Sequence, residues 1–340
     1  MLAIYLEDEQ INYIPEKDSG YTLDLTKSSC NNGVTIAWDS DSWNALVNFA
    51  NYSAENINRT KCTMYFIEAD FCDLNPDAAV CIILALTNDS SELVYDETDD
   101  NNLRYIGANP ENYVWFNNEL WRIIGVMNNV DDGTGKKESR LKLVRNASYG
   151  FIAWGGQKND WSLSFLQQEL NTTYLNNIDI TAQNMLSDAI WKLGGSNTSD
   201  DVTTSMFYER ERGSNVYSGS SVEWTGKVAL MYPSDYGYAT SGGSNTDRAT
   251  CLSSALSSWN SYSDCYTNDW LFDSKNPQWT LTTHSSVNYG IFRIYSSGVV
   301  NYTTSISVGD AVAVPTVYLK SFVKITGGTG TSTDPYQLSL

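Results

Sequence analysis

His284 is the only histidine in this 340-residue chain, so any catalytic arrangement that needs an imidazole base must use it. It stands in the run Thr282-Thr283-His284-Ser285-Ser286, where no serine has the glycine-flanked pattern of a nucleophile elbow. With 40 acidic residues, some carboxylates will be neighbours by number alone, so their presence does not indicate a glycosidase pair. The sequence therefore predicts a non-catalytic protein, and a hydrolase acting on polysaccharide is kept as an alternative.

The six cysteines are the other residues that could carry chemistry. They form three locally spaced couples: Cys30 with Cys62, Cys72 with Cys81, and Cys251 with Cys265. None forms a CxxC pair and there is a single histidine, which argues against a zinc site. An even count in a chain rich in Tyr, Asn and Ser indicates disulfides and an oxidising compartment. The connectivity does not follow from the sequence, and pairing of nearest neighbours is our hypothesis.

The charge balance limits the class of partner. The chain has 21 basic and 40 acidic residues, a formal net charge of −19. Nucleic acids are bound by neutralising phosphates with Lys and Arg, so this protein would repel them, and an anionic membrane surface is excluded on the same ground. The negative charge favours solubility outside the cell, with calcium or a cationic partner as the alternative. No cofactor is predicted, because no calcium motif accompanies the acidic residues.

No apolar run approaches the ~20 residues that a membrane-spanning helix requires, so no membrane insertion by this segment is predicted. The opening Met1-Leu2-Ala3-Ile4-Tyr5-Leu6 is too short for the apolar region of a signal peptide. If the protein is exported, we expect its leader or anchor to lie outside this sequence.

The segment from Thr282 to Thr304 has the composition of a recognition surface. Tyrosine offers large, stiff contact area, while Ser and Asn provide adaptable hydrogen bonds. The alternative is an ordinary amphipathic hairpin that buries Ile291, Phe292 and Ile294. The predicted ligand-binding residues are Trp279, His284, Asn288, Tyr289, Arg293, Tyr295, Asn301 and Tyr302.

Residues 1–67 are expected to form a small disulfide-stapled β domain. Polarity alternates in residues 20–25 and 34–38, with the turn signal Asn31-Asn32-Gly33 between them. Residues 61–66 are a further predicted strand, which a Cys30–Cys62 bridge would staple. An exposed N-terminal run could pair as an added strand with a neighbouring molecule. Its predicted assembly residues are Ala3, Ile4, Tyr5, Leu6, Ile11, Tyr13 and Ile14.

Residues 68–111 are predicted to be a connector. Asn75 and Pro76 favour the start of a short helix over residues 76–86. The acidic stretch Asp96-Glu97-Thr98-Asp99-Asp100 is interpreted as a solvated loop, with an opportunistic cation site as the alternative.

The main domain is expected over residues 112–340. Strands 113–116 and 120–127 flank Asn117-Asn118 as a hairpin with a two-residue turn. Two helices follow, one over about 162–174 and one from about 181 to 193, where Gly194-Gly195 ends it. Residues 196–276 are polar and predicted to be rich in loops, with a strand at 227–231. Within them, Glu209-Arg210-Glu211-Arg212 is interpreted as a solvated charge ladder. Further strands are predicted at residues 140–145, 279–282, 290–295, 299–302 and 312–320.

Several stretches resemble a family of exported, often pilin-like surface proteins of gut Firmicutes. They are residues 102–107 and 115–125, Trp161-Ser162-Leu163 with Leu166 and residues 170–174, residues 226–239, and the ending Val317-Tyr318-Leu319-Lys320 with residues 325–331. The resemblance covers about two thirds of the chain. It implies export to the cell surface more than any activity, because the family is functionally uncharacterised.

The order of elements also resembles the C-type-lectin-like fold of formylglycine-generating-enzyme relatives. In that fold a hairpin and two helices precede a long loop region, and a closing strand and hairpin carry the ligand surface. Residues 279–281 and 290–302 match that position. The Trp-Asn-Asp tripeptide of calcium-binding lectins is absent, so calcium-dependent sugar binding does not follow.

These observations predict an α+β, mainly β protein: a small N-terminal β-sandwich-like domain and a C-type-lectin-like α+β domain with two helices. The expected function is that of an extracellular cell-surface adhesin or ligand-binding protein that recognises a glycan or protein through its C-terminal hairpin. The alternative is a pilin-like structural subunit that self-associates into an extracellular filament.

Overall fold

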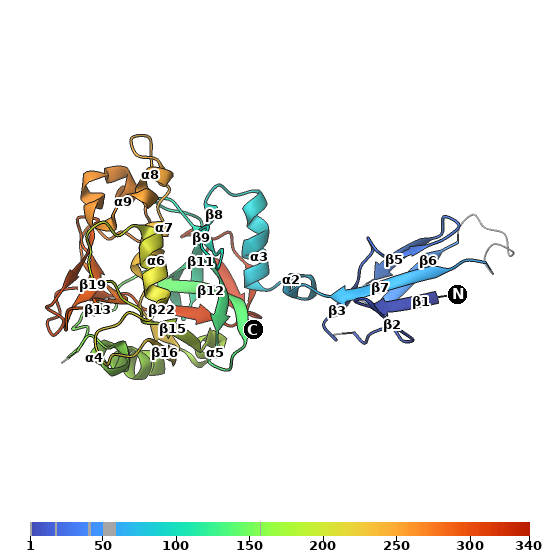
Figure 1. Cartoon of the computed structure of the whole chain (residues 1–340), viewed down its shortest axis with the longest axis horizontal. Helices are drawn as coiled ribbons and strands as arrows, with labels where there is room; N and C mark the ends of the chain where they lie inside the picture. The colour runs from blue at the N-terminus through green and yellow to red at the C-terminus, as the bar shows by residue number, and fades with distance from the viewer. Residues whose placement is uncertain (1, 18, 40–41, 50–58, 157) are drawn as a thin grey trace. The chain divides into compact units, whose positions relative to one another are not determined.

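The computed structural model describes residues 2–17, 19–39, 42–49, 59–156 and 158–340. The chain divides into two compact units, Met1–Pro76 and Asp77–Leu340 (Figure 1). Strands account for 34% of the chain and helices for 21%, which confirms the predicted α+β, mainly β class.

The predicted connector over residues 68–111 does not form a separate segment. Its part from Asp77 onward belongs to the larger unit. Ala79, Val80 and Ile83 on one short helix and Leu103 on a strand all lie in that unit's hydrophobic core. Apolar burial therefore sets the boundary at Pro76, later than the predicted boundary at residue 67.

The smaller unit is a five-stranded sheet with a hairpin packed on it. The sheet runs β2-β1-β7-β3, with β4 also paired to β7, and β5 and β6 form the hairpin. Trp38 of the hairpin packs edge-on against Phe66 of β7, with ring centroids 5.7 Å apart. Cys30 and Cys62 face each other across β4 and β7 and form a disulfide, as predicted. The bounds are β1 Leu2–Leu6, β2 Glu9–Ile11, β3 Tyr21–Leu23, β4 Ser29–Cys30, β5 Thr35–Asp39, β6 Asn44–Asn48, β7 Cys62–Glu68 and helix α2 Phe71–Leu74.

The N-terminal run is not the free strand that the sequence predicted. Strand β1 pairs with β2 on one side and with β7 on the other, so Ala3, Ile4, Tyr5 and Leu6 already have strand partners. Ile4 is buried in the small core. The edge of the sheet belongs instead to β2, which contains Ile11, and beyond it Tyr13 and Ile14 are exposed.

The larger unit contains two principal sheets. The first runs β14-β22-β12-β11-β10-β24-β23, with β17, β9 and β8 attached to it, and the second runs β13-β21-β18-β19-β20. Short helices surround them (Figure 1). The strand bounds are β8 Leu93–Tyr95, β9 Leu103–Tyr105, β10 Tyr113–Phe116, β11 Glu119–Asp131, β12 Lys137–Arg145, β13 Gly150–Phe151, β14 Leu186–Ser187, β15 Ala189–Lys192, β16 Glu223–Gly226, β17 Val228–Ala229, β18 Gln278–Thr283, β19 Ile291–Ile294, β20 Val300–Thr303, β21 Val312–Ala313, β22 Thr316–Leu319, β23 Lys324–Gly327 and β24 Tyr336–Ser339.

The helices of this unit are all short. Their bounds are α3 Ala79–Ala85, η1 Leu86–Asn88, η2 Trp161–Leu163, α4 Phe165–Glu169, η3 Leu170–Tyr174, α5 Ile180–Met185, α6 Thr204–Arg212, α7 Pro233–Tyr238, α8 Arg248–Ser253, η4 Leu256–Ser261 and α9 Ser263–Thr267. In the part of the chain that the structure describes, no helix has the length and apolar character needed to cross a bilayer.

Two predicted hairpins are confirmed. Strands β10 and β11 pair around Asn117 and Asn118, whose φ angles of 55° and 58° are those of a type I′ turn. Strands β19 and β20 pair as an antiparallel hairpin from Ile291 to Thr303.

The predicted helix from residue 181 to 193 is wrong in its second half. Helix α5 ends at Met185, and Ala189–Lys192 instead form strand β15, which pairs with β16. Ala189 and Trp191 alternate as buried residues along it, a strand period rather than a helical one. The polar region 196–276, predicted to be mostly loop, contains α6, α7, α8 and α9.

The remaining cysteines are also bonded. Cys251 and Cys265 form a disulfide within the core of the larger unit, as predicted. Cys72 and Cys81 are disulfide-bonded too, so none of the six cysteines is free.

Gly125 fixes the approach of β9 to β11. A Cβ at this position would lie 2.0 Å from the carbonyl oxygen of Leu103, a backbone atom that cannot rotate away. Gly125→Ala is therefore expected to cost about 1–3 kcal/mol of the free energy of unfolding, because β9 must move. Chemical denaturation of the full chain measures the loss. Gly327→Ala is the matched control, since no atom lies within 4 Å of a Cβ built there, and an equal loss in both variants would contradict this account.

Candidate functional site

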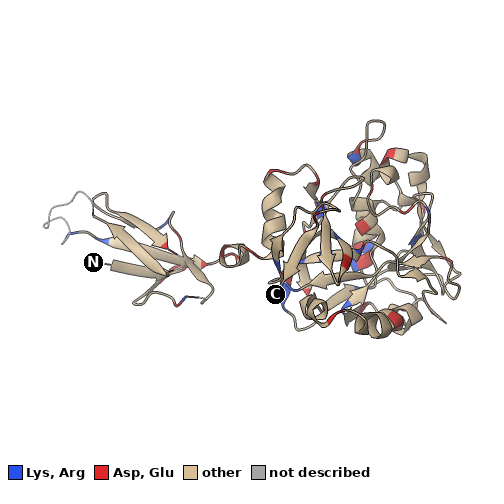
Figure 2. Ribbon diagram, turned by 180° about the vertical axis from the view of Figure 1, so that it is seen from behind, with Lys and Arg blue, Asp and Glu red and all other residues tan. Residues whose placement is uncertain are grey.

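Four charged side chains lie together in the interior of the larger unit, and we call them the ion network: Asp96, Arg104, Lys142 and Asp235. Arg104 Nε lies 2.9 Å from Asp96 Oδ2, and Arg104 Nη1 lies 2.7 Å from Asp235 Oδ1. Lys142 Nζ lies 2.5 Å from Asp235 Oδ2. All four side chains are at most 1% exposed, and their two positive and two negative charges balance. Figure 2 shows basic and acidic segments side by side within this unit.

Different elements supply these four residues. Arg104 comes from β9, Lys142 from β12 and Asp96 from the loop that follows β8. Asp235 lies in the first turn of α7, where its Oδ2 also accepts a hydrogen bond from the backbone N–H of Tyr232 at 2.9 Å. Pro233 suits this helix start, because its fixed φ is helical and it lacks the N–H that would be unsatisfied there. The ion network therefore ties two strands to a loop and a helix.

The ion pairs determine the charge state of the groups in the network. Burial disfavours the charged form of Asp235, but Lys142 and Arg104 outweigh it and lower its pKa to about 2. Burial lowers the pKa of Lys142 to about 8 despite the opposing attraction of Asp235. At neutral pH both groups of this pair are thus mainly ionised.

A second buried charge lies beside the network. Glu211 on α6 is fully buried and accepts hydrogen bonds from the backbone N–H of Ser234, at 3.0 Å, and from its hydroxyl. Arg212 Nη1 lies 3.5 Å from Glu211 Oε2. Burial raises the pKa of Glu211 to about 7, against the opposing effect of Arg212. Next to this pair lies a pocket of about 690 Å³, which Arg212 lines and Glu211 does not, so Glu211 does not present a carboxylic acid to a ligand there.

Tyrosines cover the cationic groups. Arg212 stacks on the ring of Tyr208, with Cζ 3.3 Å from the centroid, and Arg104 lies 5.4 Å from the ring of Tyr238. Lys142 Nζ lies 4.5 Å from the ring of Tyr232 and 5.6 Å from that of Tyr318. These contacts add cation–π attraction to the ion pairs and hold the rings in place.

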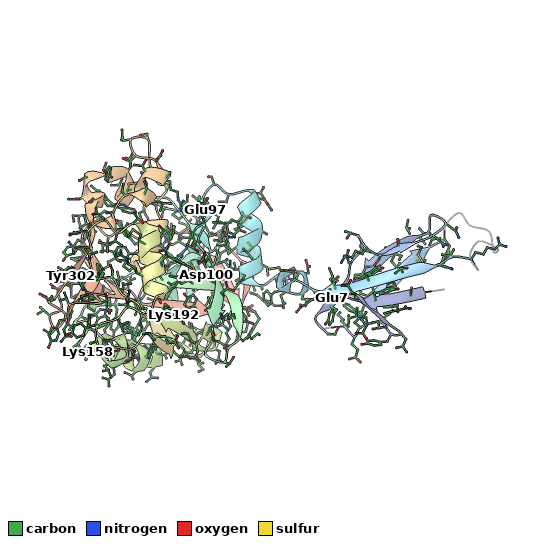
Figure 3. All side chains as sticks on the ribbon, in the orientation of Figure 1. Glu7, Glu97, Asp100, Lys158, Lys192 and Tyr302 are labelled. Carbon is green, nitrogen blue, oxygen red and sulfur yellow. A yellow bond between two sulfur atoms is a disulfide. The ribbon has the colours of Figure 1, made fainter. Side chains whose placement is uncertain are left out.

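These tyrosines form one wall of the pocket of about 690 Å³, which we call the tyrosine pocket. Its other walls come from the loop after β8, the end of β11, the start of β12, β15 and α6. Its charged and tyrosine lining residues, together with Ser205, are Glu97, Asp99, Asp100, Asp131, Lys137, Lys192, Tyr208, Glu209, Arg212, Tyr232, Tyr238 and Tyr318. Figure 3 labels Glu97, Asp100 and Lys192.

The four pocket tyrosines differ in what their hydroxyl groups do. The Tyr208 hydroxyl donates to Asp100 Oδ2 and accepts from Asn102 Nδ2 at 3.0 Å, and that of Tyr232 donates to the carbonyl of Lys192 at 2.9 Å. Within the described residues, the hydroxyls of Tyr238 and Tyr318 have no hydrogen-bond partner. Burial raises the pKa of all four tyrosines, so they are neutral at physiological pH and can donate a hydrogen bond.

The pocket lining carries more negative than positive charge. Its acidic residues are Glu97, Asp99, Asp100, Asp131 and Glu209, and its basic residues are Lys137, Lys192 and Arg212. Two of the three cations are already near carboxylates: Arg212 Nε lies 3.5 Å from Asp100, and Lys192 Nζ lies 2.6 Å from Glu223. The lining therefore presents mainly hydrogen-bond acceptors together with tyrosine hydroxyls. Across the described residues, no group of three or more His, Cys, Asp or Glu side chains is arranged to hold a metal ion.

The residues predicted from the sequence lie elsewhere in the larger unit, on and near the β19–β20 hairpin. Figure 3 shows Tyr302 well apart from Glu97, Asp100 and Lys192. Trp279 is fully buried and donates to the carbonyl of Ile152, and His284 is 3% exposed with Nδ1 accepting from two backbone N–H groups. Neither side chain is on the surface, which corrects the expectation that both contact a ligand.

The other predicted site residues are more accessible. Tyr289 is 41% exposed with a φ of 65°, and Asn288 precedes it in the turn before β19. Arg293 pairs with Asp310 at 3.0 Å and stacks on Tyr295 at 4.3 Å. Asn301 and Tyr302 lie half-buried on β20, and the Tyr302 ring packs edge-on against His284. The structure brings these residues together as a hairpin face, but none of them lines either the tyrosine pocket or the smaller pocket around Arg122.

Sequence reasoning missed the tyrosine pocket and the ion network. It interpreted Asp96–Asp100 and Glu209–Arg212 as solvated, whereas Asp96 and Glu211 are buried. A usable signal was present in the strands: Arg104 lies between Leu103 and Tyr105, and Lys142 lies between Leu141 and Leu143. Basic residues are few in this chain, with 21 in all, and apolar neighbours on both sides indicate a strand that is buried on both faces. A charged side chain in such a strand needs a buried partner of opposite charge.

No protein-family model matches this chain, and neither the curated proteins nor the solved structures compared with it yield a match.

Proposed function

We propose that this chain is an extracellular, non-catalytic binding protein that holds part of a glycan or protein ligand in the tyrosine pocket. The observation that carries this proposal is a pocket of about 690 Å³ with a fixed tyrosine wall and unpaired acceptors. That volume lies within the roughly 300–1,000 Å³ typical of ligand sites. The disulfides support a location in an oxidising, extracellular compartment.

The chemistry of the lining favours a polar ligand rich in hydrogen-bond donors. Carboxylates at Glu97, Asp99 and Glu209 have no ion-pair partner among the described residues, and they accept O–H or N–H donors. Tyr238 and Tyr318 offer free hydroxyls for the same purpose. Sugar hydroxyls and the amino groups of a protein ligand both meet these requirements.

The buried ion network supports binding by holding the pocket in shape before the ligand arrives. Tyr232, Tyr238 and Tyr318 pack on cations that are themselves fixed by Asp235 and Asp96. Ordering side chains when a ligand binds costs free energy, so a wall that is already ordered gives a higher affinity for the same contacts.

A tryptophan placed in the pocket is expected to abolish binding. Ser205 is exposed on α6 and lines the pocket, and its hydroxyl has a single hydrogen-bond partner among the described residues, Thr203, so Ser205→Trp fills the space with little effect on folding. Ser253→Trp is the matched control, because Ser253 is exposed on α8 and lies outside the lining. The two variants and the unmodified chain would be applied to an array of oligosaccharides and of peptides.

We expect the array to retain the unmodified chain and the Ser253→Trp variant, with at least about tenfold weaker retention of Ser205→Trp. Equal retention of all three proteins would place the binding surface outside the pocket. No retention of any of them would contradict the binding function itself.

A further inference from the structure

A second, smaller pocket of about 280 Å³ lies elsewhere in the larger unit. We call it the Arg122 pocket, after the charged residue from β11 that lines it. Its polar and charged lining includes Arg122, Arg145, Asn146, Ser148, Ser274 and one carboxylate, Asp273. The Asp273 oxygens already accept hydrogen bonds from the backbone N–H of Lys275 at 2.7 Å and the amide of Asn276 at 3.0 Å. Trp270 also lines the pocket. It shares no lining residue with the tyrosine pocket.

Arg122 is a nearly buried cation without a counter-ion. It is 7% exposed, and its guanidinium lies between two aromatic rings, 4.2 Å from the centroid of Tyr113 and 4.5 Å from that of Trp270. No carboxylate among the described residues lies within the 4.0 Å of an ion pair. Burial lowers the pKa of Arg122 only to about 10, so the group is charged at neutral pH.

The neutral partners of Arg122 leave part of its guanidinium unused. Nε donates to Asn112 Oδ1 at 2.8 Å, and Nη2 makes two longer contacts, 3.4 Å to Asn109 Oδ1 and 3.3 Å to the carbonyl of Pro110. Among the described residues Nη1 has no hydrogen-bond acceptor. It is also not one of the fully buried side-chain atoms that lack a partner, so it is accessible. Nη1 therefore has N–H donors that no protein acceptor uses, on a residue that lines the pocket.

The other two buried arginines described in this unit both have acid partners. Arg104 has two carboxylate partners, and Arg140 pairs with Glu138 at 3.0 Å. Arg145, which is half-buried and lines the same pocket as Arg122, pairs with Glu119 at 2.6 Å. The carboxylates that act electrostatically on Arg122 are those of Glu92 and Asp269, and neither forms an ion pair with it. Burial raises the pKa of Asp269 well above its ordinary value, which weakens it as a counter-charge.

We propose that the Arg122 pocket binds a small carboxylate. A planar guanidinium with a free Nη1 matches a carboxylate oxygen, and the charge-assisted hydrogen bond supplies the counter-ion that the protein lacks. The Asn146 amide and the Ser148 and Ser274 hydroxyls lie in the same lining and can bond the second oxygen. The formal charge of −19 favours a singly charged ligand over a polyanion. The carboxylate of an acidic sugar and that of a peptide C-terminus both have this chemistry.

Titration calorimetry on the full chain tests the proposal with sodium acetate, sodium glucuronate and N-acetylglycine, at constant ionic strength, with glucose as the uncharged control. We expect acetate and at least one of the larger carboxylates to bind, and glucose not to bind. Glucuronate binding with weak N-acetylglycine binding would identify an acidic sugar, and the reverse a peptide terminus. Absence of binding by all three carboxylates would overturn the proposal.

Arg122→Gln removes the charge and is expected to weaken carboxylate binding at least about tenfold. The matched control is Arg293→Lys: Arg293 also stacks on aromatic rings, but it has Asp310 as its own acid partner. Binding that persists in Arg122→Gln would place the carboxylate elsewhere and overturn the proposal.

A second measurement does not depend on the folding of the variant. In the unmodified chain labelled with ¹⁵N-tryptophan, the indole signal of Trp270 should shift on addition of glucuronate or N-acetylglycine, because its ring contacts Arg122. Trp270→Phe assigns the signal. An unmoved Trp270 signal in the presence of a carboxylate that binds would also overturn the proposal.

Discussion

Asp235→Asn is expected to lower the free energy of unfolding of the larger unit by about 3–5 kcal/mol, because it leaves two buried cations without their common partner. Arg104 and Lys142 both contact the Asp235 carboxylate, and neither can reach water. An asparagine keeps the shape and can still accept from the N–H of Tyr232, so the loss reports the missing charge. Urea denaturation of the full chain, followed by near-UV circular dichroism, measures it.

Asp89→Asn provides the control for this experiment. Asp89 is exposed in the same unit and forms no ion pair among the described residues, so its replacement should change stability by less than about 0.5 kcal/mol. If Asp235→Asn costs no more than Asp89→Asn, the network is not a buried set of charges.

The stability of the larger unit is also expected to fall as pH rises from about 4.5 to about 7. Burial raises the pKa of Glu211 from near 4.5 to about 7, so the folded state holds this proton more tightly than the unfolded state does. The stabilisation that the bound proton of Glu211 gives the folded state is fully present below pH 4.5, declines as pH rises, and is lost above pH 7. Linkage gives a total of about 3 kcal/mol for a difference of this size.

The difference between the unmodified chain and Glu211→Gln isolates this contribution. Asp235 titrates below its ordinary value near 3.8 and Lys142 between about 8 and 10.5, both outside this window. Asp269, whose pKa burial raises well above its ordinary value, acts equally in both proteins. His284, whose pKa burial lowers, acts equally in both proteins. The free energy of unfolding of both proteins is measured by urea denaturation between pH 4.5 and 7.5. The value for the unmodified chain minus the value for Glu211→Gln should decrease steadily as pH rises. A difference that stays constant across this range would mean that Glu211 is ionised throughout.

The sequence predicted those elements whose signals are local. Alternation of apolar residues and the pair Asn117-Asn118 were sufficient for the β10–β11 hairpin, because both the pleat and the type I′ turn are encoded within a few residues. The same holds for the β19–β20 hairpin. The β15 strand was missed because its pairing with β16 joins residues as far apart in sequence as Ala189 and Gly226, and this pairing overrode the apparent helical period.

The candidate site depends on contacts that are still more distant in sequence. Arg104 meets Asp235 across 131 residues, and Lys142 meets it across 93. Short polar runs such as Asp96–Asp100 and Glu209–Arg212 are usually solvated, and only the folded arrangement supplies the partners that permit their burial. Composition alone directed attention to the Tyr-rich hairpin, since it reveals which residues recognise ligands well but not where the chain encloses a space.

Hydrogen–deuterium exchange tests most directly whether the tyrosine pocket holds the ligand, because a bound ligand slows exchange where it lies. The full chain would be measured with and without the oligosaccharide or peptide that it binds most strongly on the array. We expect slower exchange in the segments 97–102, 128–131 and 205–213, each of which contributes several residues to the pocket lining. Protection confined to residues 284–302 would contradict it and return the binding site to the C-terminal hairpin.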